Sequence, residues 1–437
     1  MQKADLIIRN GNVVTMNADM EVIEDGAIAV IGKHIAAVGE SGSILQEYEA
    51  DNVIDGSDKI VIPGLINAHT HLPMTYFRGL ADDLPLMEWL QKHIWPAEAK
   101  FLQPEFVYHA SLHGAADLIR NGITCFNDMY FFSEEVARAA SEAGIRGIVG
   151  EGVLDFPFVG RQGASETLQY ALESINNLKE IDLIDVAIAP HAIYTCCKEN
   201  LQKCFEFACD NDLLIHTHVS ETEQEVKDSI TNFGKRPVDY LNEIGVLDHK
   251  IIFAHGVWIN RDEMSILKDK NISVIINTES NLKLTSGFAP VKEYLDCGIN
   301  LCLGTDGVSS NNDLDIFSEM DFTAKVQKAY NQDPTLLPAQ QVFRMATIDA
   351  AKALFKQDSI GSLETGKLAD IVLIDVRHLE NQPFYNIYSH LIYSTNGKSV
   401  ADVIINGEIV MKDRLLTNID EKEILDRSRE YVKQVKA

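Results

Sequence analysis

The amino-acid sequence predicts an α/β protein: a (β/α)₈ TIM barrel with a small β-sandwich domain built from both ends of the chain. Three observations support this fold class. Between about residues 60 and 330, short β-branched apolar runs alternate with longer amphipathic segments, as in βα units. Eight such runs occur, the number of strands that closes a TIM barrel. The two chain ends carry strands of alternating polarity that are interrupted by turns.

Most of the eight expected barrel strands are nearly all apolar, which is typical of parallel strands covered on both faces. They lie at residues 61–71, 123–129, 146–152, 186–192, 213–219, 251–257, 272–277 and 299–307. Helices are expected between them at residues 105–120, 133–143, 165–178, 199–211 and 315–330. Gly122 and Gly144 stand where two of these helices should end, because glycine readily adopts the left-handed conformation of a C-cap.

The terminal segments 4–38 and 367–411 contain the pairs Asn10-Gly11 and Asn406-Gly407, and such pairs favour tight hairpin turns. Each end alone is too short for a good core. We therefore expect one composite β domain from residues 1–57 and 363–437, beside a catalytic barrel at residues 58–362. The charged stretch 412–437 predicts a solvated terminal helix.

The charge balance narrows the class of function. The 437 residues include 38 Lys and Arg against 65 Asp and Glu, a formal net charge of −27. An acidic surface repels phosphate backbones and anionic lipids, so neither nucleic acid nor a membrane is an expected partner. The amino-terminal residues show no secretory signal, and the seven cysteines contain no Cys-x-x-Cys pair. We expect a cytoplasmic protein with reduced thiols and a small-molecule substrate.

Histidines at the ends of expected strands predict a metal site. His69 and His71 end the first strand, and residues two apart on a strand point to the same side. Other candidate ligands end three further strands: His216 with His218, then His255, then Asp306. The carboxyl ends of barrel strands form one catalytic face, so these side chains should converge. Spacing alone does not choose between His216 and His218, and Asp306 could instead cap a helix.

Across nearly the whole chain the sequence resembles the amidohydrolase superfamily, and within it the deaminases of 5-methylthioadenosine and S-adenosylhomocysteine. The resemblance rests on motifs at residues 63–71, 78–86, 95–98, 189–192, 216–225, 280–287 and 304–315. It implies hydrolytic deamination of an adenine nucleoside to the inosine analogue and ammonia. The substrates it implies are 5-methylthioadenosine, S-adenosylhomocysteine, 5′-deoxyadenosine or adenosine.

The resemblance also implies the catalytic residues. One zinc ion per chain, with iron or manganese as alternatives, would be held by His69, His71, His218 and Asp306. Glu221 matches the general acid/base that also contacts the substrate, and His255 matches a histidine beside the attacking water. Asp306 would help to deliver a proton to the departing amine. Such a metal centre supplies an activated water, because bound zinc lowers the pKa of water to about 7.

Substrate-binding residues follow from the same resemblance. Glu98 matches a carboxylate that holds the ribose hydroxyls, His191 a histidine that contacts the purine, and Trp95 would line the pocket. Many relatives carry an arginine where this chain has Glu151, and a carboxylate there disfavours an anionic homocysteine tail. Arg161, in an expected loop, could still contact such a tail. We expect neutral 5′ groups to be accepted at least as well as S-adenosylhomocysteine.

Alternative functions stay open at this point. The same scaffold resembles guanine and 8-oxoguanine deaminases and the triazine chlorohydrolases. Glu98 together with His191 favours a nucleoside as substrate. The two ribose hydroxyls can donate hydrogen bonds to a carboxylate, whereas a free base has no such hydroxyls. A metal-free binding or assembly protein is the alternative outside the enzyme class, since fold alone does not fix function. Association into a homo-oligomer also stays open.

Overall fold

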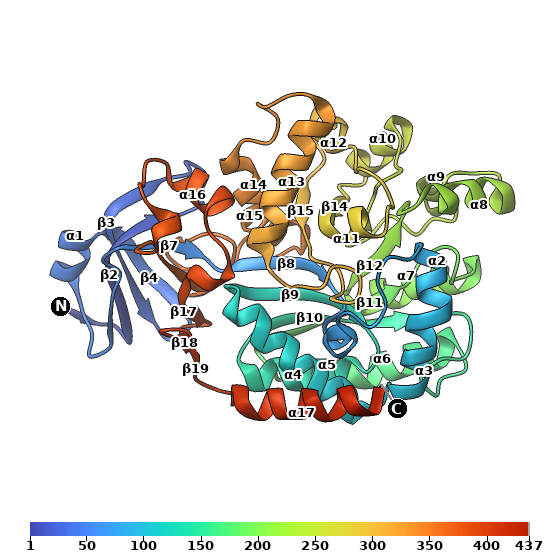
Figure 1. Cartoon of the computed structure of the whole chain (residues 1–437), viewed down its shortest axis with the longest axis horizontal. Helices are drawn as coiled ribbons and strands as arrows, with labels where there is room; N and C mark the ends of the chain where they lie inside the picture. The colour runs from blue at the N-terminus through green and yellow to red at the C-terminus, as the bar shows by residue number, and fades with distance from the viewer. Residues whose placement is uncertain (436–437) are drawn as a thin grey trace.

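The computed structural model describes residues 1–435 and contains the expected barrel (Figure 1). Eight parallel strands lie in consecutive order, each hydrogen-bonded to the next. They are β8 (Leu65–Thr70), β9 (Ile123–Tyr130), β10 (Arg146–Val153), β11 (Ile184–Pro190), β12 (Leu214–Val219), β13 (Ile251–His255), β14 (Ser273–Ile276) and β15 (Leu301–Leu303). The first and last strands meet just beyond β15, where the Asp306 amide donates to the His69 carbonyl at 3.0 Å. Gly304 permits this approach, because a Cβ there would lie 2.7 Å from the His69 nitrogen.

The five helices expected between barrel strands are confirmed within one or two residues. They are α4 (Pro104–Arg120), α5 (Ser133–Ala143), α6 (Ala164–Leu178), α7 (Lys198–Asn211) and α13 (Ile316–Asn331). Gly122 and Gly144 adopt the expected positive φ angles of 75° and 79° where α4 and α5 end. Further helical segments of the barrel are η1 (Leu72–Phe77), α2 (Leu86–Trp89), η2 (Leu90–Ile94), α3 (Trp95–Phe101), α8 (Glu223–Phe233), α9 (Pro237–Glu243), α10 (Arg261–Asp269), α11 (Thr278–Lys283), α12 (Val291–Cys297), α14 (Ala339–Met345) and α15 (Ile348–Ala353).

Both chain ends meet in one β domain, as expected, beside the barrel at the left of Figure 1. Its main sheet has nine strands: β2 (Leu6–Val14), β3 (Val22–Ile31), β4 (His34–Glu40), β6 (Val53–Asp55), β7 (Lys59–Pro63), β16 (Ile371–Asp375), β17 (Val400–Ile405), β18 (Glu408–Lys412) and β19 (Leu415–Leu416). A small sheet pairs β1 (Gln2–Lys3) with β5 (Tyr48–Glu49). The short helices of the chain ends are α1 (Ser41–Glu47), η3 (Leu379–Asn381), α16 (Ile387–Tyr393) and η4 (Gly397–Ser399). The domain limits given above stay a prediction.

Residues 61–71, expected as one strand, form two. β7 pairs with β16 and β2 in the terminal sheet, and only β8 belongs to the barrel. The chain passes between them at Gly64, where a Cβ would lie 1.9 Å from the Thr124 hydroxyl oxygen. A continuous apolar run cannot distinguish these two strands, because both are buried.

Two expectations for the chain ends need correction. Asn406-Gly407 makes the expected turn between β17 and β18, with φ angles of 55° and 83°, but Asn10-Gly11 lies within β2 at a shift of register. The terminal helix α17 (Glu421–Val435) is not wholly solvated. It lies along α4 (Figure 1), where Tyr431 is buried with its ring centroid 5.2 Å from that of Phe106. Its charged residues are mostly exposed, although Glu421 pairs with Arg120 of α4.

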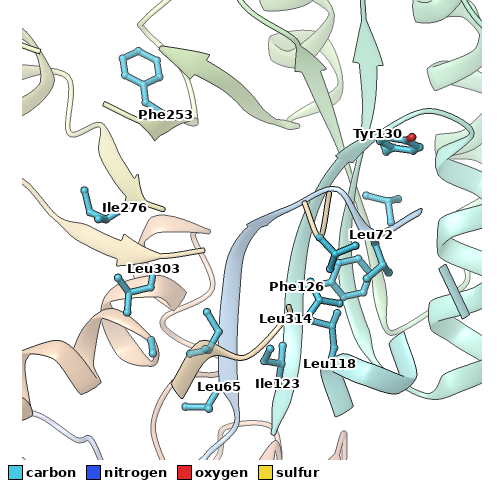
Figure 2. Close-up of a cluster of buried hydrophobic side chains, with 14 of the residues drawn as sticks. Leu65, Leu72, Leu118, Ile123, Phe126, Tyr130, Phe253, Ile276, Leu303 and Leu314 are labelled. Carbon is cyan, nitrogen blue, oxygen red and sulfur yellow. The ribbon is translucent and has the colours of Figure 1, made fainter. Parts of the chain in front are cut away.

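The packed barrel core holds in place the strand ends, which carry polar side chains. Leu65, Ile123 and Phe126 of neighbouring strands and Leu118 of α4 belong to one buried cluster (Figure 2). Close packing of this kind leaves the strands little freedom to shift. No helix among the described residues is long and apolar enough to cross a membrane.

Candidate metal centre and active site

Four barrel strands bring five expected site residues to one point. His69 and His71 come from the end of β8, His218 from β12, His255 from β13, and Asp306 follows β15. The Nε2 atoms of His69 and His71 lie 3.3 Å and 3.2 Å from Asp306 Oδ1. The donor atoms of His69, His218 and His255 also lie within 4.8 Å of one another. The expected convergence at the carboxyl ends of the strands is therefore present.

His255 and Asp306 occupy an unusual backbone conformation. Their φ angles are 71° and 60°, in the left-handed region that residues other than glycine rarely adopt. Such a conformation costs about 1–3 kcal/mol and persists where the surrounding structure enforces it. Strain at both residues, in the same small region, is typical of a functional site.

Each histidine of the cluster has its Nδ1 atom held by a partner behind it, so that Nε2 faces the centre. The Nδ1 atom of His69 contacts His216 Nε2 at 2.9 Å, and that of His71 contacts the Met129 carbonyl. The Nδ1 atom of His218 contacts the His191 carbonyl at 2.9 Å, and that of His255 contacts Asn281 Oδ1 at 3.0 Å. Metal-binding histidines are oriented in this way by their outer hydrogen bonds. The structure also separates His216 from His218: His216 lies behind His69, and its Nδ1 atom meets Asn127 Nδ2 at 3.0 Å.

The donor atoms fit a divalent metal ion. His69 Nε2 is buried and has no hydrogen-bond partner among the described residues. Leaving such an atom unsatisfied costs about 1–3 kcal/mol, which a bound cation would offset. Imidazole nitrogens combined with one carboxylate oxygen are a donor set typical of zinc enzymes.

Asp306 is prepared to act as an ionised ligand. Burial opposes its ionisation, but the nearby imidazoles of His69 and His71 hold its pKa well below the ordinary value. Its second oxygen, Oδ2, accepts hydrogen bonds from Ser280 Oγ at 2.6 Å and Ser310 Oγ at 3.0 Å. The carboxylate is thereby fixed with Oδ1 toward the histidines, and it does not cap a helix.

Glu221 lies beside the cluster, in a cavity of about 740 Å³ that includes its open mouth. Its Oε1 atom accepts a hydrogen bond from Ser286 Oγ at 3.1 Å, and its Oε2 atom lies 3.9 Å from His255 Nε2. Burial raises the pKa of Glu221. A carboxyl group with a raised pKa, close to a metal site, can both accept and return a proton near neutral pH.

The same cavity is lined by further residues expected to bind substrate. Glu98, on α3, is 3% exposed and accepts a hydrogen bond from Tyr130 Oη at 2.6 Å. Burial raises the pKa of Glu98 to about 7, although the Tyr130 hydrogen bond opposes the rise. Trp95, one turn earlier on α3, and His191, directly after β11, also line the cavity. The expected substrate-binding residues therefore share one cavity, with the exception of Arg161.

Arg161 does not line this cavity. Its guanidinium forms an ion pair with the fully buried Glu151 and lies 3.9 Å from the Tyr170 ring centroid. Glu151 also accepts a hydrogen bond from the Ser133 amide at 2.8 Å. The carboxylate of Glu151, which was expected to disfavour an anionic tail, is therefore paired with Arg161 outside this cavity.

Several contributors to the site were not singled out from the sequence. Ser280, Asn281 and Ser286 lie within the motif 280–287 that supports the family resemblance, so a signal for them existed. Tyr130 ends the apolar strand β9 with no distinctive spacing, and only its hydrogen bond to Glu98 in the cavity identifies it. Glu225 resembles an ordinary glutamate in the first turn of a helix, so its sequence position gave no signal.

A parallel barrel whose strand ends gather histidines and an aspartate around one point defines the class of metal-dependent barrel hydrolases. Residues 60–410 match the Amidohydrolase family, and the chain belongs to this family.

Individual relatives agree with this assignment. The chain is 46% identical to the 5-methylthioadenosine/S-adenosylhomocysteine deaminase of Thermodesulfovibrio yellowstonii over 98% of each chain. It is 44% identical to the 5′-deoxyadenosine deaminase of Methanothermobacter thermautotrophicus over 92% of this chain and 93% of that one. The crystal structure of an adenosine deaminase from Xanthomonas campestris with bound zinc matches with a TM-score of 0.97 at 38% identity, over 100% of this chain and 99% of that one. The protein is therefore a hydrolase of the deaminase type.

Proposed function

We propose that this protein is a zinc-dependent deaminase that replaces the 6-amino group of an adenine nucleoside by oxygen, giving the inosine analogue and ammonia. The observation that carries the proposal is one cavity that is lined by a metal-ligand cluster, by Glu221 and by a second buried carboxylate, Glu98. The names of the relatives at 46% and 44% identity support the same substrate class. Seven free cysteines in the described chain accord with the reducing cytoplasm.

Different residues would bind the metal ion, transfer the protons and orient the water in the proposed reaction. His69, His71, His218 and Asp306 would hold zinc, which supplies an activated water at neutral pH. Glu221 takes a proton from the attacking water and delivers it to N1 of the purine, so that C6 becomes electrophilic. His255 orients the water, and Asp306 passes a second proton to the departing amine.

Other residues that line the cavity would select a nucleoside. Glu98 accepts hydrogen bonds from the two ribose hydroxyls, His191 contacts the purine, and Trp95 forms part of the wall. A free base or a triazine offers Glu98 no hydroxyl groups. The buried carboxylate would then keep only its hydrogen bond from Tyr130, and acceptor sites left unsatisfied cost binding energy.

A screen of ammonia release by the zinc-loaded protein tests the proposal. The substrates are adenosine, 5′-deoxyadenosine, 5-methylthioadenosine, S-adenosylhomocysteine, guanine and a chlorotriazine. We expect the highest kcat/KM among the adenine nucleosides. A higher kcat/KM for guanine would assign the protein to the guanine deaminases, and chloride release from the triazine to the chlorohydrolases.

The raised pKa of Glu98 predicts a pH limit on nucleoside binding. The ionised carboxylate accepts hydrogen bonds from the ribose, so kcat/KM for adenosine should fall as the pH drops below about 7. Tyr130→Phe removes a hydrogen bond that favours ionisation and should move this acidic limb to higher pH. Glu98→Gln, which cannot ionise, is the matched control and should lose the limb. An identical limb in all three proteins would assign it to another group.

The 5′ substituent is expected to be neutral. Among the described residues that line the cavity there is no lysine or arginine, and the nearby Arg161 is neutralised by Glu151. Steady-state kinetics should therefore give 5-methylthioadenosine or 5′-deoxyadenosine a kcat/KM at least equal to that of S-adenosylhomocysteine. Glu151→Gln leaves Arg161 charged and should shift the ratio toward S-adenosylhomocysteine by about tenfold, whereas Arg161→Met should not. A clear preference of the unmodified protein for S-adenosylhomocysteine contradicts this assignment.

A further inference from the structure

The chain turns sharply between the metal ligand His218 and the proposed acid/base Glu221. β12 ends at Val219 and α8 begins at Glu223, so three residues make the turn. Ser220 adopts a φ of 52°, in the left-handed region, although it is not glycine. This conformation directs the chain so that Glu221 enters the cavity. Something outside these residues must hold the conformation, because it is unfavourable by itself.

Glu225 supplies that restraint. Its Oε1 atom accepts a hydrogen bond from the Ser220 amide and its Oε2 atom accepts one from the Glu221 amide, both at 2.8 Å. Its own amide donates to the side chain of Thr222, the N-cap of α8, at 3.1 Å. Glu225 is 6% exposed and is not among the residues that line the cavity. One buried carboxylate therefore accepts hydrogen bonds from both backbone N–H groups that immediately precede the N-cap.

We propose that Glu225 is a positioning residue for Glu221: its carboxylate fixes the 220–221 backbone so that the Glu221 side chain stands at the metal centre. The proposal rests on the proposed function, in which Glu221 transfers the protons. Glu225 touches neither substrate nor metal and acts only through Glu221.

The geometry explains why a carboxylate is needed. Two backbone N–H groups require two acceptor oxygens, and the carboxyl group of Glu225 places one oxygen against each of them, although burial raises its pKa to about 8. Glutamine offers one oxygen and one NH₂ group, so one backbone N–H would face another donor. Aspartate keeps both oxygens but is one methylene shorter, so it cannot maintain both 2.8 Å contacts without moving the turn.

Glu263 is a matched control elsewhere in the barrel. It is fully buried in the first turn of α10, and its two oxygens accept hydrogen bonds from the Val238 amide at 3.1 Å and the Asn260 amide at 3.0 Å. It also pairs with Arg236. Glu263→Gln therefore removes a comparable buried restraint, at a turn that holds no residue of the proposed catalytic group.

The experiment compares Glu225→Gln with Glu263→Gln in the zinc-loaded full chain. We expect both variants to unfold at lower temperature. Glu225→Gln alone should lower kcat for adenosine by about 10- to 100-fold, because a displacement of about 1 Å is enough for such a loss. KM should stay within about threefold of the value for the unmodified protein, because the contacts that bind the substrate in the ground state are kept. The zinc content should be unchanged. Equal kcat values for the two variants would overturn the proposal.

A double-mutant cycle with Glu221→Gln separates positioning from general destabilisation. If Glu225 acts through Glu221, adding Glu225→Gln to Glu221→Gln should lower kcat no further. A further loss equal to that of the single variant would mean an independent structural role. If Glu225→Gln gives no soluble protein, Glu225→Asp replaces it in both comparisons with the same expected kcat loss. Absence of deamination by the unmodified protein would instead refute the proposed function and leave this comparison without a substrate.

Discussion

Removal of the metal is expected to abolish deamination, and about one equivalent of zinc per chain is expected to restore it. Without a cation, the buried Nε2 atom of His69 has no hydrogen-bond partner among the described residues, and the proposed ligands around Asp306 Oδ1 lack the ion that they would share. An ion that binds only the folded chain also stabilises it, by about 2.7 kcal/mol at a free concentration 100 times its Kd. Metal analysis, ammonia release and Tm should therefore change together when the protein is treated with a chelator and then reloaded.

Two variants make this test specific. Asp306→Ala removes a proposed ligand, so zinc should restore neither activity nor Tm. His390→Asn removes a buried histidine of α16 that hydrogen-bonds the carbonyls of Asn386 and Pro383, and its zinc binding should be normal although its stability falls. Full activity of the metal-free protein would contradict the zinc assignment. Nucleoside binding without turnover in the zinc-loaded protein would favour the binding-protein alternative.

Glu221→Gln is expected to lower kcat by about 10²–10⁴-fold, the range that a general acid/base contributes. The amide keeps the size of the side chain and can still accept the Ser286 hydrogen bond, but it cannot carry the proton from water to N1. The zinc content should be unchanged, because Glu221 is not among the proposed ligands. Single-turnover kinetics with adenosine and metal analysis of the same preparation measure both quantities.

Glu223→Gln is the control for this substitution. Glu223 lies two residues further on, in the exposed first turn of α8, where it pairs with Lys227. Surface pairs of this kind contribute about 0–1 kcal/mol, so activity and stability should be nearly unchanged. An unaltered kcat in Glu221→Gln would transfer the proton-carrying role to another group of the centre, with His255 the nearest candidate at 3.9 Å.

Much of the fold was predictable because it depends on local patterns. The five expected helices follow an amphipathic period that neighbouring residues set, and α5 begins and ends at the expected residues. The errors occur where a distant partner decides the outcome. β7 leaves the barrel because it pairs with β16, and α17 buries Tyr431 because α4 offers it an apolar face. Neither partner lies near its counterpart in the sequence.

The sequence by itself determined which chemistry is available: imidazoles and a carboxylate at the ends of barrel strands, with Glu221 three residues beyond His218. Only the tertiary structure decided which groups face the centre and which lie behind it. His216 contacts His69 on the side away from the centre, and Arg161 pairs with Glu151 outside the cavity. Glu225 accepts a hydrogen bond from the backbone of the turn that carries Glu221. The physical reason is that side-chain identity fixes which atoms can donate, accept or bind a metal, whereas partners distant in sequence fix where those atoms point and what charge they keep.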